Sequence, residues 1–328
     1  SYDRNKELMG TIGLNVTHDA SLCHCVDGEI KLFIEEERLS RKKHDSIPIK
    51  AIFEYLEKDK VGITGLEYSD YDLKDTAAFI DVAIRKTVKD VEFNIYKEHH
   101  FLHALCGFYN SEFEEADVVV VDGMGNYIDD DYHECASRWH ISKPDVVHLI
   151  EKQGTVRFDC KRLQKKDMHG TFPMGIGMAY AAISSYLGFG PLGSGKVMGL
   201  APYGKEDSNI KPFVLDNGLV NSKLFYRTQY GANFIPYDYL PEDQHVDNQR
   251  IRNLCYRLQK DFERWMTEFI LRCDYKNIVL TGGCALNCVA NYEYLKHLPK
   301  GVKLYIEPVS GDAGTAIGLA KYMHYSKL

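Results

Sequence analysis

Two histidines at helical spacing are the residues with the clearest potential for chemistry. His99 and His103 lie four positions apart, within a segment whose apolar spacing predicts a helix through Tyr96–Tyr109. That spacing puts both imidazoles on one helix face, about 5–6 Å apart at Cβ, where they can offer two nitrogens to a metal. The alternative is a surface helix whose histidines are satisfied by hydrogen bonds. The segment lacks the His-Glu-x-x-His order of a zinc protease.

Two aspartates follow or precede elements at places where α/β folds put ligands. Asp122 ends the apolar run Ala116–Val121 and is followed by glycine, as expected of a carboxylate at the end of a central buried strand. Asp312 stands just before a predicted helix near Thr315–His324. Each has a plainer alternative. Asp122 could bind its own backbone in a turn, and Asp312 could cap the helix.

Two glycine-rich segments could contact phosphate. Gly282-Gly283 joins the predicted strand Asn277–Leu280 to a helix, where close backbone approach and free N–H groups favour a nucleotide; tight packing is the alternative. Within the glycine-rich loop 188–204, the segment 190–197 nearly matches a Walker A motif. We reject that interpretation because Val197 replaces the magnesium-binding Ser or Thr and the preceding element reads as a helix. Lys196 could still touch phosphate.

Two basic side chains near the N-terminus complete the candidates. His18 follows the first predicted strand, where a histidine can serve as general acid, base or oxyanion donor. Lys43, in the basic run 41–45, could balance a phosphate or a developing negative charge. For such a run by itself, a solvated face is the usual alternative.

The elements that would position these residues alternate between strands and helices. A hairpin is predicted from strands at Ser21–Val26 and Ile30–Glu35 around Asp27-Gly28. The other expected elements are a strand at Thr11–Val16, helices at 49–57, 75–86, 175–187 and 251–271, a helix from Ala285, and a strand at Val302–Glu307. No internal repeat is visible. The layout predicts an α/β protein.

Composition excludes several classes of protein. The 328 residues are 45% hydrophobic and 27% charged, with a formal net charge of -7, so no basic excess favours nucleic acid as a partner. No apolar run reaches the roughly 18 residues of a membrane span, and the N-terminus has no signal-peptide core. The nine cysteines form no Cys-x-x-Cys pair and are expected to be reduced thiols of a cytoplasmic protein.

Taken in order, the motifs resemble one family, the carbamoyltransferases of the nodulation-factor, cephamycin and tobramycin pathways. Their N-terminal domain is similar to the tRNA threonylcarbamoyl-transferase subunit. The resemblance spans about residues 10–320 and rests on the segments 13–21, 35–45, 99–104, 121–123, 196–204, 282–287 and 311–316. Each piece is weak by itself, but the ordered set is specific.

The resemblance implies an actin/Hsp70/sugar-kinase-like fold with two similar lobes of mixed sheets flanked by helices, which we divide at 10–150 and 151–328. It also implies that a carbamoyl group passes from metal-bound carbamoyl-adenylate to a hydroxyl of a small molecule. The implied residue roles are metal binding by His99, His103, Asp122 and Asp312, carbamoyl and phosphate contacts by His18 and Lys43, and nucleotide binding by Lys196, Gly282, Gly283, Asn287 and Gly311. The metal would be iron or another divalent ion, acting as a Lewis acid.

Family members continue into a YrdC-like domain that makes the adenylate from carbamoyl phosphate and ATP. The present sequence ends at Leu328, so we expect the activation step to lie in a separate domain or partner. Three other functions are weighed against this one: a tRNA threonylcarbamoyl transferase, a sugar kinase of the same fold and a non-catalytic nucleotide-binding module. A sugar kinase would not need two histidines and two aspartates at a metal. The residues of the 196–204 motif are more similar to the branch of the family that acts on small molecules. The net negative charge offers tRNA little to bind, so both features argue against tRNA. The acceptor is expected to contact loops in 125–170 and 205–245, which carry no motif that names it.

Overall fold

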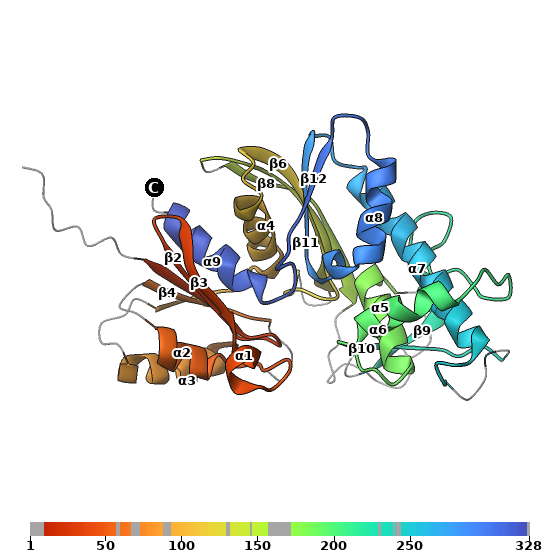
Figure 1. The fold of residues 1–328 in the computed structure, drawn as a ribbon, viewed down its shortest axis with the longest axis horizontal. Coiled ribbons are helices and arrows are strands. Elements are labelled where there is room, and N and C mark those ends of the chain that lie inside the picture. Colours follow the sequence, from red (N-terminus) through yellow and green to blue (C-terminus); the bar gives the residue numbers. More distant parts are fainter. Residues whose placement is uncertain are drawn as a thin grey trace, which may run out of the picture.

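The computed structural model describes residues 10–56, 60–66, 73–87, 93–128, 132–144, 146–156, 172–228, 231–238, 240 and 244–326. It contains two five-stranded mixed sheets with helices on their faces and one small hairpin. The two large sheets stand side by side, with helices between them and beyond them (Figure 1). The predicted α/β class is therefore confirmed.

The first sheet has the strand order β3-β2-β1-β4-β5. Its strands are β1 (Thr11–Asn15), β2 (Ser21–Val26), β3 (Glu29–Glu35), β4 (Lys60–Thr64) and β5 (Phe93–Tyr96). β1 runs antiparallel to β2 and parallel to β4. The predicted hairpin turn is present, and Asp27 and Gly28 both have positive φ, 53° and 77°, as a two-residue turn that matches the strand twist requires.

The second sheet repeats this arrangement, with the order β12-β11-β6-β7-β8. Its strands are β6 (Glu115–Val121), β7 (Tyr132–Ser142), β8 (Val146–Val156), β11 (Asn277–Thr281) and β12 (Lys303–Ile306). β6, like β1, is central, antiparallel to one hairpin strand and parallel to a crossover strand. Its valines are buried, as their unbroken run predicts for a strand covered on both faces.

Two helices, α4 (His99–Asn110) and α9 (Gly314–Tyr325), lie between the sheets and pack against each other (Figure 1). α9 covers β1 and β2, whereas α4 packs on β6 and β11. Their contact is close, because a Cβ on Gly318 would collide with the backbone oxygen of Leu102. This contact brings the two sheets, and the loops at their ends, into one unit.

The remaining helices cover the outer faces. Beyond the first sheet lie α1 (Glu36–Ser40), α2 (Ile49–Tyr55) and α3 (Leu73–Thr87). Beyond the second lie α5 (Ile176–Tyr186), α6 (Ser194–Leu200), α7 (Gln249–Ile270), α8 (Cys288–His297), the hairpin β9 (Phe225–Thr228) and β10 (Gly231–Phe234), and the 3-10 turns η1 (Ala201–Tyr203), η2 (Ser222–Leu224) and η3 (Gly283–Leu286). Among the described residues, no helix is long and apolar enough to cross a membrane.

Several expectations about elements need correction. The helix expected from Tyr96 begins at His99, because Tyr96 pairs with Thr64 as the last residue of β5. The loop expected at 188–204 contains the short helix α6, which the fully buried Val197 anchors. β4 was not predicted at all. The boundary between the two lobes at residues 150 and 151 stays a prediction. In the structure, strands β6–β8 belong to the same sheet as β11 and β12.

Candidate metal and transfer site

Four of the predicted site residues come together between the sheets. We call His99, His103, Asp122 and Asp312 the His/Asp cluster; all four are buried, and one potential ligand atom from each lies within 4.8 Å of the others. His99 and His103 come from the first turns of α4, Asp122 directly follows β6, and Asp312 precedes α9. The strand-end and helix-start positions that the sequence picked out therefore meet at one point.

The ligand atoms face one another at short distances. His99 Nε2 lies 3.0 Å from Asp122 Oδ2 and 3.5 Å from Asp312 Oδ1. His103 Nε2 lies 3.1 Å from His99 Nε2 and 3.5 Å from Asp122 Oδ2. Burial lowers the pKa of His99, but Asp312 and Asp122 outweigh burial and raise the pKa to about 10. Hydrogen bonds from the histidines hold the pKa of Asp122 well below its usual range despite burial.

This donor set fits a divalent cation. Two imidazole nitrogens and two carboxylates form a mixed nitrogen and oxygen set of the kind that first-row transition metals bind. The Nε2 atoms of His99 and His103 lie 3.1 Å apart. One of them must therefore donate a hydrogen bond to the other, unless both bind a cation. The metal assignment of the His/Asp cluster stays a prediction, and its geometry is compatible with it.

The third histidine of the helix has a different role. His100 is fully buried, and its Nδ1 lies 2.9 Å from Ser137 Oγ, which also accepts a bond from Trp139 Nε1. Burial lowers the pKa of His100 to about 4, so the ring is neutral at pH 7. Helical spacing separates this core histidine from the pair that faces the aspartates.

The plainer interpretations of the two aspartates can be checked directly. Asp122 does accept a bond from Gly123 N at 2.7 Å, but through Oδ1, so that Oδ2 faces the histidines. Asp312 makes no side-chain cap for α9. Its carboxylate instead accepts a bond from Thr17 Oγ1 at 3.1 Å.

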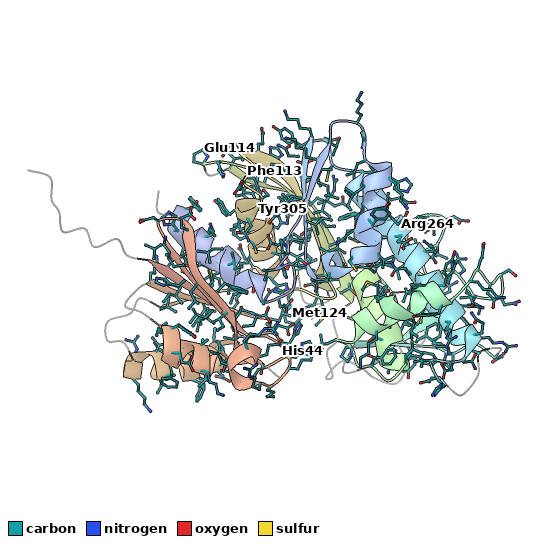
Figure 2. All side chains as sticks on the ribbon, in the orientation of Figure 1. His44, Phe113, Glu114, Met124, Arg264 and Tyr305 are labelled. Carbon is teal, nitrogen blue, oxygen red and sulfur yellow. The ribbon has the colours of Figure 1, made fainter. Side chains whose placement is uncertain are left out.

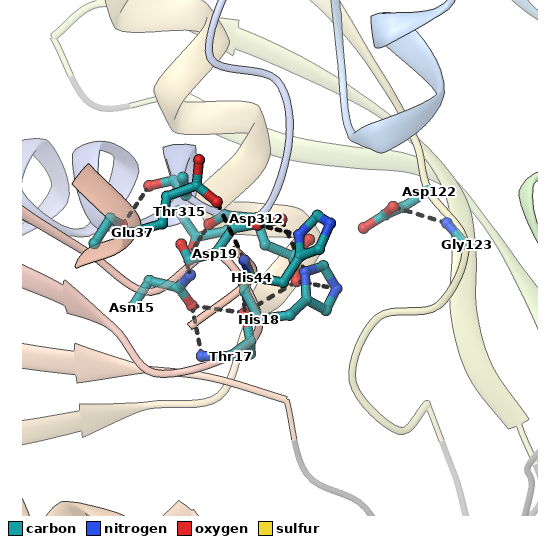
Figure 3. A network of polar contacts seen from close by, with 12 residues as sticks. Asn15, Thr17, His18, Asp19, Glu37, His44, Asp122, Gly123, Asp312 and Thr315 are labelled. Carbon is teal, nitrogen blue, oxygen red and sulfur yellow. Dashed lines mark hydrogen bonds and ion pairs between the residues drawn. The ribbon is translucent and has the colours of Figure 1, made fainter. Parts of the chain in front are cut away.

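His18 joins the cluster through Asp312. Its Nε2 lies 3.3 Å from Asp312 Oδ2 (Figure 3). The Asp312 carboxylate raises the pKa of His18 to about 9, against the opposing effect of burial. The positive charge of a protonated imidazole beside the cluster can stabilise an oxygen that gains negative charge.

The predicted nucleotide residues show contacts within the protein. Gly282 has φ 88°, and a Cβ on it would collide with Val121 O; a Cβ on Gly283 would lie 2.8 Å from Asp122 Oδ1. The two glycines thus let the end of β11 approach the end of β6. Asn287 caps α8 by accepting from Ala290 N at 3.0 Å and is also bonded to Gln259.

Three further candidates are less constrained. A Cβ built on Gly311 would lie 3.7 Å from Leu286 Cδ1, which is an ordinary van der Waals distance. Lys196 is exposed on α6, 5.1 Å above the Phe189 ring, and Lys43 is exposed in the loop after α1. Nucleotide or phosphate contact by these residues stays a prediction.

Sequence reasoning missed the residues that hold the start of α4. Asn126 Oδ1 accepts from His99 N at 3.0 Å, and Glu134 Oε2 accepts from His100 N at 3.3 Å. Asn126 Nδ2 also donates to Gly65 O at 3.5 Å, which links the second sheet to the loop after β4. Both side chains are buried. No local pattern marks them, because their partners lie far away in the sequence.

The chain matches the carbamoyltransferase N-terminus family over residues 54–321. Nodulation protein NolNO of Sinorhizobium fredii is 26% identical over 348 residues, covering 93% of this chain and 46% of that protein. Nodulation protein NolO of Bradyrhizobium diazoefficiens is 27% identical over 241 residues, covering 68% of this chain and 37% of that protein. The chain thus spans about half the length of the curated relatives it matches.

Solved structures support the fold. HypF of T. kodakarensis superposes with a TM-score of 0.54 at 12% identity, covering 97% of this chain and 47% of that one. Full-length HypF in a phosphate- and nucleotide-bound form gives a TM-score of 0.50 at 12% identity, covering 96% and 55%. The predicted actin-like, two-sheet architecture is confirmed at the level of the fold. With a family match that covers most of its length, the chain belongs to the carbamoyltransferase N-terminus family.

Proposed function

We propose that this chain carries the site at which a carbamoyl group moves from carbamoyl-adenylate to the hydroxyl of a small-molecule acceptor. The observation that carries the proposal is the buried His/Asp cluster, with His18 bonded to Asp312 at its edge. Family membership gives the group that is transferred. The cluster gives a place where a carbonyl can be polarised away from bulk water.

His99, His103, Asp122 and Asp312 would hold the cation, with iron as the first candidate among divalent metals because of the family resemblance. The bound cation would supply Lewis-acid polarisation of the donor's carbonyl. Burial of the four side chains keeps water from competing for the site. The nucleotide would lie along Gly282, Gly283 and Gly311, with Lys196 and Asn287 as further contacts.

In the transfer step, the acceptor oxygen forms a bond to the carbamoyl carbon while the bond from that carbon to the AMP oxygen breaks. AMP leaves with the electron pair of the broken bond, and the hydroxyl proton passes to solvent. The positive charge of His18 would stabilise the oxygen that gains charge, as its position beside Asp312 allows. Lys43 would balance the phosphate charge.

Activation of carbamoyl phosphate by ATP is assigned to a YrdC-like domain or partner, consistent with relatives about twice as long as this chain. Two other functions remain: transfer of a threonylcarbamoyl group to tRNA, and nucleotide binding without catalysis. The net charge of -7 disfavours tRNA. The convergence of two histidines and two aspartates disfavours a module that only binds nucleotide. We also propose a cytoplasmic location.

The test measures metal content and turnover together. Wild-type protein loaded with Fe²⁺ is mixed with synthetic carbamoyl-adenylate and glycerol, and release of AMP is followed. We expect bound metal in wild type, and loss of metal and of metal-dependent AMP release in His103→Ala and Asp122→Ala. His297→Ala, an equivalent change on α8, is the control and should behave as wild type. Unchanged metal content in both cluster variants would remove the basis of the proposal.

A further inference from the structure

A carboxylate beside the His/Asp cluster is shared by two imidazoles. Asp19 Oδ1 lies 2.6 Å from His44 Nδ1, and Asp19 Oδ2 lies 3.0 Å from His18 Nδ1 (Figure 3). The two rings meet edge to face, with centroids 6.4 Å apart. Both oxygens of Asp19 are therefore engaged, one by each histidine.

This sharing sets which ring nitrogens carry protons. A carboxylate only accepts hydrogen bonds, so Nδ1 of each histidine must be the donor. For His18 the bond at Nδ1 aims the opposite nitrogen, Nε2, at Asp312, 3.3 Å away. The hydrogen bonds from His18 and His44 lower the pKa of Asp19 although burial opposes them, so Asp19 is anionic at pH 7.

The same contacts fix the loop that carries Lys43. Ala20 N donates to Asp45 O at 2.8 Å, and His44 N donates to Glu37 Oε2 at 3.1 Å. His44 thus binds α1 through its backbone and the end of the β1–β2 connection through its ring. In Figure 2 it lies on the side of the first sheet that faces the rest of the molecule.

The backbone here is held in uncommon conformations. Asp19, Arg41 and His44 have φ of 61°, 62° and 56°. Non-glycine residues adopt this region only where surrounding contacts compensate, and such positions gather at functional sites. These three residues lie in the two loops that carry His18 and Lys43.

We propose that Asp19 and His44 are positioning residues, which orient His18 toward Asp312 and hold the Lys43 loop against the same edge of the site. The effect of this positioning on catalysis rests on the proposed function, whereas the orientation of His18 by Asp19 does not. Asp19, Glu37 and His44 are close enough to hold a second cation. We argue against that use because His44 Nδ1 is already bonded to Asp19, and Glu37 is bonded to His44 N and paired with Arg38.

The first test observes the hydrogen bonds in metal-free protein. Imidazole N–H groups bonded to a carboxylate exchange slowly, so the downfield Nδ1–H signals of ¹⁵N-histidine-labelled wild type should include one from His18 and one from His44. These two are assigned by their loss in His18→Gln and His44→Gln, which separates them from the signal of His140, whose Nδ1 is bonded to Asp117. Asp19→Asn keeps the left-handed backbone but offers one acceptor oxygen, so at least one signal should vanish. Asp45→Asn is the matched control, since the Asp45 side chain bonds within its own loop, to Ser46 N and Lys42; both signals should persist. Two unchanged signals in Asp19→Asn would overturn the proposal.

The second test separates positioning from folding. In Fe²⁺-loaded protein, Asp19→Asn and His44→Asn should lower kcat for AMP release about 10- to 100-fold, the range for loss of a partner that orients a functional histidine. KM and metal content should stay near wild type. Loss of metal or of folding together with kcat would show a structural role only and reject the proposal. If wild type releases no AMP, the proposed function fails, whereas the NMR signals still decide the positioning of His18.

Discussion

At the scale of single residues, the His/Asp cluster depends on side chains that never touch its ligand atoms. Asn126 accepts from the first N–H of α4 and donates to Gly65 O. The N–H groups of a first helical turn have no partner within the helix. Asn126 supplies that partner from the β6–β7 loop and so sets where His99 begins the helix.

Asn126→Ala should therefore weaken Fe²⁺ binding about 10- to 100-fold, as loss of residues that orient metal ligands does. It should also lower the free energy of unfolding by about 1–3 kcal/mol, because a buried N–H loses its acceptor. Titration of the metal-free protein with Fe²⁺ and urea unfolding measure the two effects. Asn126→Asp retains the acceptor oxygen and should keep most of the affinity. Wild-type affinity in the alanine variant would contradict this role.

The two histidines that face the aspartates could be predicted from the sequence, and the role of their neighbours could not. The spacing of His99 and His103 follows from helix geometry and needs no further information. The separation of His100 also follows, since a residue one position on points about 100° away. Its partner Ser137 and the partner Asn126 of His99 come from β7 and the β6–β7 loop, and no local rule connects them to α4.

At the level of elements, one ionic network links the strands of the second sheet at the end of the sheet that lies away from the cluster. His140 on β7 bonds Asp117 at 2.8 Å and Glu115 at 3.0 Å, both on β6. Asp117 also accepts from Asp274 N and Tyr275 N before β11, and Tyr275 OH donates to Glu115. The network thus links β6, β7 and the entry to β11.

This network should make stability depend on pH. The hydrogen bond to Asp117, with the help of Glu115, raises the pKa of His140 above its usual value against the effect of burial. A raised folded-state pKa stabilises the protein fully below the unfolded value, near 6.5. That contribution is lost as pH rises through the folded value. His140→Gln should therefore cost about 0.2–1 kcal/mol at pH 5.5 and less at pH 9, measured by urea unfolding. A cost that grows with pH would contradict the sign.

Element prediction succeeded where local chemistry decides the structure and failed where packing decides it. The β2–β3 hairpin followed from Asp27-Gly28, and β6 followed from its valines. The missed strand β4 is short and carries Gly62, whose side-chain position is taken by Met323 of α9. α6 is anchored by Val197 packing under α5 and α7, although the glycines around it favour a loop.

At the scale of the whole molecule, the two sheets have the same strand order and directions, and each sends its last helix across to the other. α4 follows β5 but packs on β6 and β11, and α9 follows β12 but packs on β1 and β2. The His/Asp cluster lies where these crossing helices begin. Its geometry therefore depends on how closely α4 and α9 approach.

Gly318→Ala tests that dependence. The added Cβ would collide with Leu102 O, and overpacking of this kind costs about 1–3 kcal/mol. Forcing the helices apart should also separate His103 from Asp312 and weaken Fe²⁺ binding. Gly199→Ala on α6 is the matched control: nothing lies within 4 Å of its Cβ position, so it should stabilise the protein by up to about 1 kcal/mol. Equal effects of the two substitutions on unfolding and on metal binding would contradict this account.

The side chains available for chemistry could be predicted from the sequence: a helical histidine pair, aspartates at the end of a strand and the start of a helix, glycines after β11, and a basic segment near His18. Their types and local spacing depend only on short-range rules. The folded structure was needed to see that Asp312 and Thr17 share a hydrogen bond, that Asp19 lies between two imidazoles, and that Asn126 accepts a bond from the start of α4. Such contacts join distant parts of the chain, because they arise from the packing of two crossed helices between repeated sheets, which no local pattern contains.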